Sequence, residues 1–273
     1  MDYTKQQTER LFEQTFAYLK VAMEGHVMRI ALNRPEKRNA LTPVMVNELA
    51  YALAYAHHHS QVRAVVLAAE GSVFCAGADM KAFMGHTEPH QSTIPKPDGE
   101  VLLGELFLNL HKPAIAQVHA DVYAGGFLLL AGCTYVVARQ GVVFGLPEVK
   151  RGLFPYQVMA SLLEVMPPRK VIDWCIRGYN MPVQQALDNG LVTHVAEADQ
   201  LQATVNKLCE ELTANSPMAI NKGMEAFTHL RRQPGGPAAH HKYLQQMLMQ
   251  TIQTPDAQEG IKAFKEKRAP VWK

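Results

Sequence analysis

Short apolar segments alternate along this chain with segments of helical pattern, and this alternation constrains the fold more than any other feature. AVVLAA (64–69) has the length and composition of a buried strand, and KPAIAQVHA (112–120) and TYVVARQGVVFG (134–145) bring further strands. One helix is predicted before the first strand, from Thr42 to His59, and another between the last two, over 124–133. An order of strand, helix, strand, helix is typical of an α/β core.

The flanking segments have their own local signals. FAYLKVAMEGHVMRIALNRP (16–35) predicts a hairpin that turns at Glu24-Gly25. The helix from Thr42 has an N-cap threonine followed by Pro43 at its first position. It ends in three consecutive histidines, 57–59, which point in different directions on a helix; we expect a solvated helix end rather than a metal site.

The chain changes character towards its C-terminus. MGHTEPHQSTIPKPDGE (84–100) predicts a long loop within the α/β part. From about Arg169 onwards helical patterns dominate. We expect two parts, residues 1–200 with the α/β core and residues 201–273 as a helical region.

Composition excludes several classes of protein. The 273 residues carry a formal net charge of +2, which is too small to indicate a nucleic-acid or membrane-surface partner. No apolar run approaches the roughly 18–20 residues of a membrane helix, and the start MDYTKQQTERLFEQTF has no signal-peptide pattern. The cysteines lack CxxC spacing, so we expect free thiols, no metal and a cytoplasmic location; they are Cys75, Cys133, Cys175 and Cys209.

A glycine pair, Gly125 and Gly126, opens the apolar run AGGFLLLAGC. At a helix start such a pair leaves backbone N–H groups that can bind a phosphate or a carbonyl oxygen on which negative charge develops. The loop CAGAD (75–79) follows the strand at 64–69 and would direct a further N–H group to the same place. A glycine pair at a helix start is also often only structural, so the pair alone does not establish a site.

Glu148 in FGLPEVKRGLFP is the candidate acid/base. It lies between Pro147 and Val149, and apolar surroundings would raise the pKa of its carboxyl towards neutrality. A solvated turn glutamate is the alternative.

Five fragments together resemble the enoyl-CoA hydratase/isomerase (crotonase) superfamily, in that family's order and from about Phe16 to the C-terminus. They are LNRPEKRNAL, FCAGADMKAF, KPAIAQVHADVYAGG, FGLPEVKRGLFP and FKEKRAPVW. The resemblance implies a crotonase-like ββα-spiral core of α/β class with a helical C-terminal region. It also implies an acyl-CoA substrate, coenzyme A only as part of that substrate, no separate cofactor, and homotrimers that often pair into hexamers.

The resemblance also assigns roles to residues. It places the oxyanion hole on the backbone N–H groups of Ala78 and Gly125 and the catalytic carboxyl on Glu148. The remaining implied residues contact coenzyme A: Lys37, Arg38 and Ala40 in PEKRNAL, with Lys37 or Arg38 near the phosphates, Asp79, Met80 and Lys81 around the adenine, and Phe264 and Lys267 in the tail.

The family's second acid/base position holds a leucine here. In two-glutamate hydratases a glutamate follows the glycine run, and counting through GGFLLLAGC puts Leu128 at that position. Hydration requires a water to be oriented and deprotonated, whereas a shift of a double bond from the 3- to the 2-position needs one base and an oxyanion hole. We therefore expect isomerisation to be favoured over hydration. Other groups considered for the water have simpler interpretations: Asp121 as a turn cap, His119 as a structural histidine and Glu105 on a solvated helix face.

These observations predict an acyl-CoA-processing enzyme of the enoyl-CoA hydratase/isomerase type, with a thioester enolate held in the oxyanion hole and Glu148 as its sole acid/base. The alternative is a crotonase-fold protein that binds acyl-CoA without catalysis, or a thioester hydrolase. The sequence leaves open the acyl chain, the exact reaction and the choice between trimer and hexamer.

Overall fold

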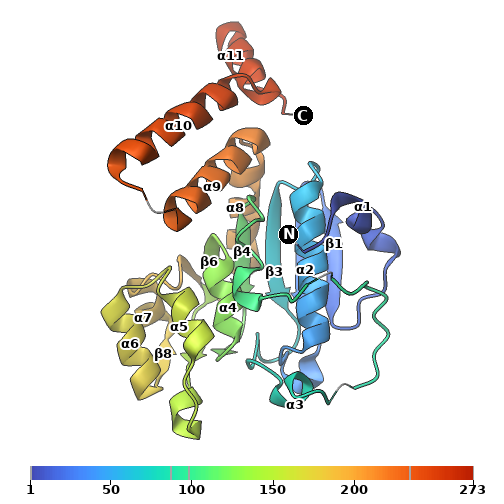
Figure 1. The fold of residues 1–273 in the computed structure, drawn as a ribbon, viewed down its shortest axis with the longest axis vertical. Helices are drawn as coiled ribbons and strands as arrows, with labels where there is room; N and C mark the ends of the chain where they lie inside the picture. The colour runs from blue at the N-terminus through green and yellow to red at the C-terminus, as the bar shows by residue number, and fades with distance from the viewer. Residues whose placement is uncertain (1, 87, 98, 234, 273) are drawn as a thin grey trace. The chain divides into compact units, whose positions relative to one another are not determined.

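The larger sheet of the computed structural model has six strands in the order β1-β2-β3-β4-β6-β9. Figure 1 labels β1, β3, β4 and β6 of this sheet. β1 and β2 are an antiparallel hairpin, and every later pair in this sheet is parallel. Its strands are β1 (Leu19–Glu24), β2 (Val27–Leu32), β3 (Ala64–Ala69), β4 (Ala114–Val118), β6 (Tyr135–Arg139) and β9 (His194–Ala196). The predicted hairpin and the predicted strands are confirmed, and with them the α/β core. The structure describes residues 2–86, 88–97, 99–233 and 235–272.

A second, smaller sheet was not expected from the sequence. It has the order β5-β7-β8, with β5 (Val122–Tyr123) parallel to β7 (Val143–Gly145) and β8 (Asn180–Pro182) antiparallel to β7. β5 is two residues long, so no alternation of apolar and polar residues marks it in the sequence.

By internal contacts the chain divides into two compact units, the first ending at Cys209 and the second beginning at Glu210. This division falls within a helix, α8, later than the 200/201 boundary expected from the sequence.

The α-helices are α1 (Lys5–Thr8), α2 (Pro43–His58), α3 (Met80–Phe83), α4 (Gly126–Gly132), α5 (Tyr156–Leu162), α6 (Pro168–Arg177), α7 (Val183–Asp188), α8 (Leu201–Thr213), α9 (Pro217–Arg232), α10 (Pro237–Ile252) and α11 (Pro255–Glu266). Short 3₁₀ helices are η1 (Leu11–Glu13), η2 (Pro35–Lys37), η3 (Leu103–Glu105) and η4 (Glu148–Arg151).

The helix α2 begins where the sequence predicted. The Thr42 hydroxyl accepts a hydrogen bond from Met45 N, and Pro43 occupies the first position. Nearly every residue from Met45 to Ala56 is buried, so α2 lies inside the first unit rather than on its surface. One of them is Glu48, whose two carboxylate oxygens accept hydrogen bonds from the backbone N–H groups of Ala17 and Tyr18. These bonds offset part of the cost of burying the carboxyl, and burial still raises the pKa of Glu48.

The three histidines at the end of α2 are not the solvated helix end that was expected. All three are half-buried, because the N-terminal segment and the chain before β4 pack around the helix end. His57 Nδ1 lies 3.2 Å from Leu110 O, and His58 Nε2 lies 3.0 Å from Tyr3 O. The His59 ring stacks on Tyr55, with 3.9 Å between ring centroids. The contacts of His57 and His58 are long-range and cannot be predicted from local sequence, whereas His59 stacks on a residue one helical turn away.

The second unit consists of the end of α8 with α9, α10 and α11, which confirms the helical C-terminal region. Asp256, at the start of α11, is 2% exposed and accepts hydrogen bonds from Ser216 Oγ (2.7 Å) and Met218 N (3.1 Å) at the start of α9. Within the described part of the chain no helix is long and apolar enough to cross a membrane.

Candidate active site

Three segments of the first unit end side by side. Cys75 forms a parallel bridge with Val122, and Tyr123 N donates to Cys75 O at 2.8 Å. On the other side, Tyr123 pairs with Gly145 in the parallel β5–β7 ladder. The loops that leave these three segments therefore start from the same edge, as expected for the carboxyl ends of parallel strands. They are 75–79, 122–125 and 143–148, which carry the three residues predicted to be catalytic.

The amide of Ala78 faces away from the chain that pairs with it. Leu41 N donates to Gly77 O, and Leu41 O accepts from Asp79 N, both at 2.8 Å. These two bonds bracket Ala78, so its own N–H is directed to the opposite side of the loop. There it meets the glycine pair, because a β-carbon added at Gly125 would lie 3.3 Å from Ala78 N. Within the described part of the chain, neither Ala78 N nor Gly125 N donates a hydrogen bond.

The close approach of these two loops depends on Gly77. Its φ of +93° is in the region that favours glycine, and a β-carbon there would lie 2.6 Å from the β-carbon of Ala124. Ala124 itself has φ +51°, which is uncommon for a residue with a side chain, and its N–H donates to Gly145 O at 3.0 Å. A left-handed residue followed by right-handed Gly125 turns successive N–H groups towards one side, an arrangement that binds anions. The predicted oxyanion residues are thus brought together with two free amides.

Glu148 begins η4, three residues after the end of β7. The side chain is half-buried, and its Oε2 is buried without a hydrogen-bond partner among the described residues. Burial raises the pKa of Glu148, while the charge of Arg151 lowers it. The carboxyl also lies close enough to Cys175, on α6, for its charge to contribute after burial to a thiol pKa of about 11. The solvated turn glutamate is therefore excluded as a description of this side chain.

The position of Leu128 is apolar in the structure as well as in the sequence. Leu128 is 5% exposed in α4 and belongs to the hydrophobic core. A β-carbon at Gly104, in η3, would lie 3.8 Å from Leu128 Cδ2 and 3.3 Å from Ser161 Oγ. The Leu128 side chain is therefore packed among apolar groups, and its correspondence to the family's second carboxylate stays a prediction from the sequence.

The other groups considered for holding water are engaged elsewhere or exposed. The two oxygens of Asp121 accept hydrogen bonds from Val143 N (2.9 Å) and from the Tyr123 hydroxyl (3.0 Å), so this carboxylate joins β5 to β7. His119 Nε2 lies 2.7 Å from Gly71 O. His119 has the structural role expected of it, whereas Asp121 links two strands instead of capping a turn. Glu105 lies on η3 and is exposed.

The residues predicted to contact coenzyme A in the first unit lie on two adjoining segments. Ala76 N donates to Arg38 O at 3.0 Å, and the bonds of Leu41 to the 77–79 loop continue this contact. Ala40 is between these two attachments. The segment 37–41 therefore runs along the loop that carries Ala78, and Asp79, Met80 and Lys81 follow directly in the chain. Phe264, 86% exposed, and Lys267 at the end of α11 belong to the second unit.

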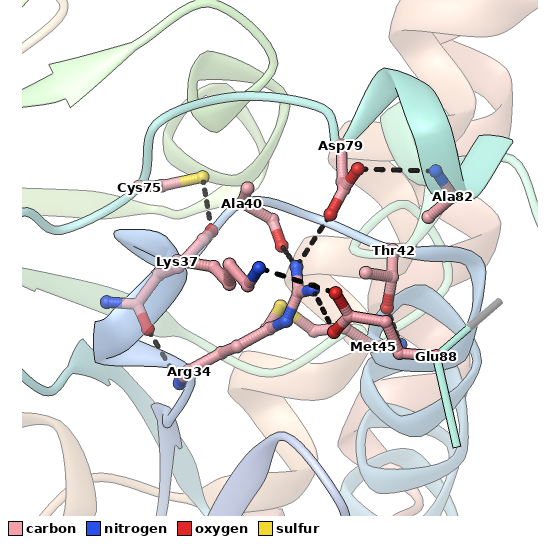
Figure 2. Close-up of polar contacts among 10 residues, drawn as sticks. Arg34, Lys37, Ala40, Thr42, Met45, Cys75, Asp79, Ala82 and Glu88 are labelled. Carbon is pink, nitrogen blue, oxygen red and sulfur yellow. Dashed lines mark hydrogen bonds and ion pairs between the residues drawn. The ribbon is translucent and has the colours of Figure 1, made fainter. Parts of the chain in front are cut away.

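Sequence reasoning missed Arg34, which organises this region (Figure 2). The side chain is 2% exposed, and its NH1 donates to Asp79 Oδ2 at 2.9 Å and to Ala40 O at 3.2 Å. Asp79 also caps α3 by accepting from Ala82 N at 3.2 Å. The NH2 of Arg34 donates to Glu88 Oε2 at 2.9 Å. Arginine side chains are mostly exposed, and the residues around Arg34 in the sequence give no indication that this one is buried.

Comparisons with known proteins show the family to which the chain belongs. Residues 22–273 match the sequence profile of the family described as enoyl-CoA hydratase/isomerase. The chain is 30% identical over 255 residues to Enoyl-CoA hydratase EchA19 of Mycobacterium tuberculosis, which covers 92% of this chain and 94% of that protein. It is 30% identical over 261 residues to carnitinyl-CoA dehydratase of Escherichia coli, covering 93% and 98% respectively. A crystal structure of an enoyl-CoA hydratase from Mycobacterium tuberculosis aligns with a TM-score of 0.81 at 29% identity, over 94% of this chain and 99% of that one.

The chain therefore belongs to the enoyl-CoA hydratase/isomerase family, and the protein is an enzyme of this family with the crotonase fold.

Proposed function

We propose that this enzyme binds an acyl-CoA thioester with the carbonyl oxygen between the N–H groups of Ala78 and Gly125. The observation that carries the proposal is the meeting of two unpaired amides at the edge where Glu148 begins η4, with its Oε2 buried and without a hydrogen-bond partner among the described residues. Such donors stabilise the oxyanion of an enolate more than the neutral carbonyl, which lowers the barrier to enolate formation. A protein that only binds acyl-CoA has no need of a desolvated carboxyl at this place.

Glu148 acts as the sole acid/base in this proposal. Its carboxylate removes a proton from the α-carbon of a 3-enoyl thioester, and the electrons of that C–H bond move into the thioester as an enolate. The resulting carboxylic acid returns the proton to the γ-carbon, which moves the double bond to the 2-position. The burial that raises the pKa of Glu148 suits a group that must both accept and release a proton.

Hydration of a 2-enoyl thioester is the second candidate reaction. It is favoured by the names of the relatives, a hydratase and a dehydratase. It is disfavoured by Leu128, because a buried methyl group neither orients nor deprotonates a water. We infer that isomerisation is the faster of the two.

The segments around Arg34 are proposed to receive the coenzyme A part. Lys37 and Arg38 are exposed cations for its phosphates, Ala40 is beside them, and the start of α3 with Asp79, Met80 and Lys81 adjoins the thioester loop. The roles of Phe264 and Lys267 remain predictions from the family resemblance. The four cysteines are free and buried, as in proteins of a reducing compartment, and the cytoplasm remains the proposed location.

We also propose a homotrimer or hexamer. In the second unit, helices α9 and α10 expose large apolar side chains, which is typical of a surface that becomes buried on association; they are Phe227, Leu244, Leu248 and Met249. Light scattering at micromolar concentration tests this, and a monomer mass would contradict it.

The test of the function is turnover of a panel of 3-enoyl-, 2-enoyl- and saturated acyl-CoAs by the wild type and by Glu148→Gln. Double-bond migration, hydration and thiol release are measured separately, so that an isomerase, a hydratase and a thioester hydrolase are distinguished. We expect Glu148→Gln to bind acyl-CoA with similar affinity and to lose about 10²–10⁴ in rate. Equal rates in the two proteins, with binding intact, would support the non-catalytic alternative.

A further inference from the structure

Glu88 is the acidic residue that links the segment after α3 to the proposed coenzyme A segment. Its Oε2 accepts from Arg34 NH2 at 2.9 Å, and its Oε1 lies 3.4 Å from Lys37 Nζ (Figure 2). One carboxylate therefore bridges a buried guanidinium and an exposed ammonium. The side chains of Glu88 and Lys37 are 54% and 50% exposed, so solvent and ligands reach both.

The buried arginine does not depend on Glu88 for neutrality. Asp79 lies 2.9 Å from Arg34 NH1 and is itself mostly buried, with a side chain 21% exposed. Arg34 keeps this ion pair, and its bond to Ala40 O, if the Glu88 carboxylate moves away. Glu88 is thus a second carboxylate partner of Arg34, which already has an ion pair with Asp79.

Lys37, unlike Arg34, depends on Glu88 for its ion pair. Within the described ranges, Glu88 is the one carboxylate with which Lys37 forms an ion pair. Neighbouring Glu36 is exposed and forms no ion pair with a described residue. The Glu88–Lys37 contact is an exposed pair, and such pairs contribute little to stability. A phosphate monoester carries about −1.5 to −2 charge and is a stronger partner for the same ammonium.

We propose that Glu88 occupies the place of a phosphate group at Lys37 and is displaced from it when coenzyme A binds. This inference rests on the proposed function. Binding then exchanges a carboxylate–ammonium pair for a phosphate–ammonium pair, and Arg34 remains neutralised by Asp79. Glu88 lowers the affinity for the coenzyme A part by competing for the cation that the ligand needs.

The experiment is calorimetric titration of coenzyme A into the full-length protein at low salt. Glu88→Gln removes the competing charge and should bind coenzyme A about two- to fivefold more tightly than the wild type. Glu36→Gln is the matched control, since it removes the same charge next to Lys37 without breaking an ion pair; its affinity should change by less than about 1.5-fold. In a Lys37→Met background, Glu88→Gln should give no gain. Thermal unfolding of each variant shows that the fold is retained.

The outcomes separate this inference from the proposed function. Weaker or unchanged binding by Glu88→Gln, or an equal gain in Glu36→Gln, overturns the competition while leaving acyl-CoA turnover intact. A wild type that binds neither coenzyme A nor acyl-CoA overturns both. A second titration with 3′-dephospho-coenzyme A identifies the phosphate: a gain that persists assigns Lys37 to the pyrophosphate, and a gain that disappears assigns it to the 3′-phosphate.

Discussion

The amide nitrogen of Ala78 lies 3.3 Å from the point that a β-carbon on Gly125 would occupy. The residue at 125 must therefore lack a side chain for the amide of Ala78 to be open to a ligand. Gly125 has φ −56° and ψ −14°, which any residue can adopt, so conformational freedom is not the reason for glycine here. Glycine is required because the Ala78 amide lies so close to the position of a β-carbon at residue 125.

Gly125→Ala should consequently fold and lose activity. The added methyl group would cover Ala78 N and displace the carbonyl oxygen from the hole, and loss of one oxyanion donor costs about 10²–10³ in kcat. Steady-state kinetics together with thermal unfolding measures both effects. Gly223→Ala is the control, because Gly223 lies in α9 with nothing within 4 Å of an added β-carbon. An active Gly125→Ala enzyme would argue against the proposed oxyanion hole.

The rate should depend on pH through Glu148. The base must be ionised to remove a proton, and burial raises the pKa of this carboxyl above its ordinary value of 4.5. As pH falls through the raised pKa, kcat/KM for isomerisation should fall with it, whereas an ordinary glutamate would keep its rate down to about pH 4.5. A pH–rate profile measures this, and the residual rate of Glu148→Gln should lack the acidic limb.

Arg34→Met should destabilise the first unit by about 3 kcal/mol. It removes the guanidinium from a buried ion pair and leaves the Asp79 carboxylate and Ala40 O without their partner. Urea unfolding followed by fluorescence measures the change. Arg10→Met gives the comparison, because the Arg10–Glu13 pair spans 3.9 Å with side chains 78% and 70% exposed, and its loss should cost less than about 1 kcal/mol. Similar costs for the two variants would contradict the organising role of Arg34.

Lys112 should make stability rise with pH in the alkaline range. Its ammonium donates to the carbonyls of Ala56 and His59 at the end of α2, and burial lowers its pKa to about 8 from an ordinary 10.5. Between these values the unfolded chain binds the proton and the folded chain does not, so the free energy of unfolding increases with pH, by up to roughly 3 kcal/mol.

Lys112→Met removes this titration. The free energy of unfolding of wild type minus that of Lys112→Met, measured from pH 7 to 10.5, isolates the lysine from the tyrosines and cysteines that titrate in the same range. A difference that is constant with pH would mean that the amine is charged throughout.

The sequence predicted those features that depend on residues close together in the chain. The start of α2 follows from the Thr42 hydroxyl and the fixed φ of Pro43, and the strand at 64–69 from its six small apolar residues. The loops proposed to be catalytic could also be found, because their glycines and the Pro147-Glu148 pair are contiguous in sequence. Contacts between residues far apart in the sequence could not be predicted from it. Arg34 is buried against Asp79, 45 residues away, and His58 contacts Tyr3, 55 residues away.

The substitution Leu128→Glu introduces the second carboxyl group that the proposed site lacks. If a water site is otherwise present, a carboxyl here should raise hydration of a 2-enoyl-CoA by up to about 10²–10⁴, and isomerisation should fall or stay level. Leu128 is 5% exposed, so the variant should also lose about 1–3 kcal/mol of stability, more at a pH where the new carboxyl is ionised. Leu128→Gln is the matched control, since its amide brings polarity of the same size without a titrating proton. The two reactions are assayed side by side on short and medium acyl-CoAs. Equal hydration by Leu128→Gln would show that polarity rather than acid/base chemistry was missing, and wild-type hydration within about tenfold of a two-glutamate enzyme would defeat the isomerase preference.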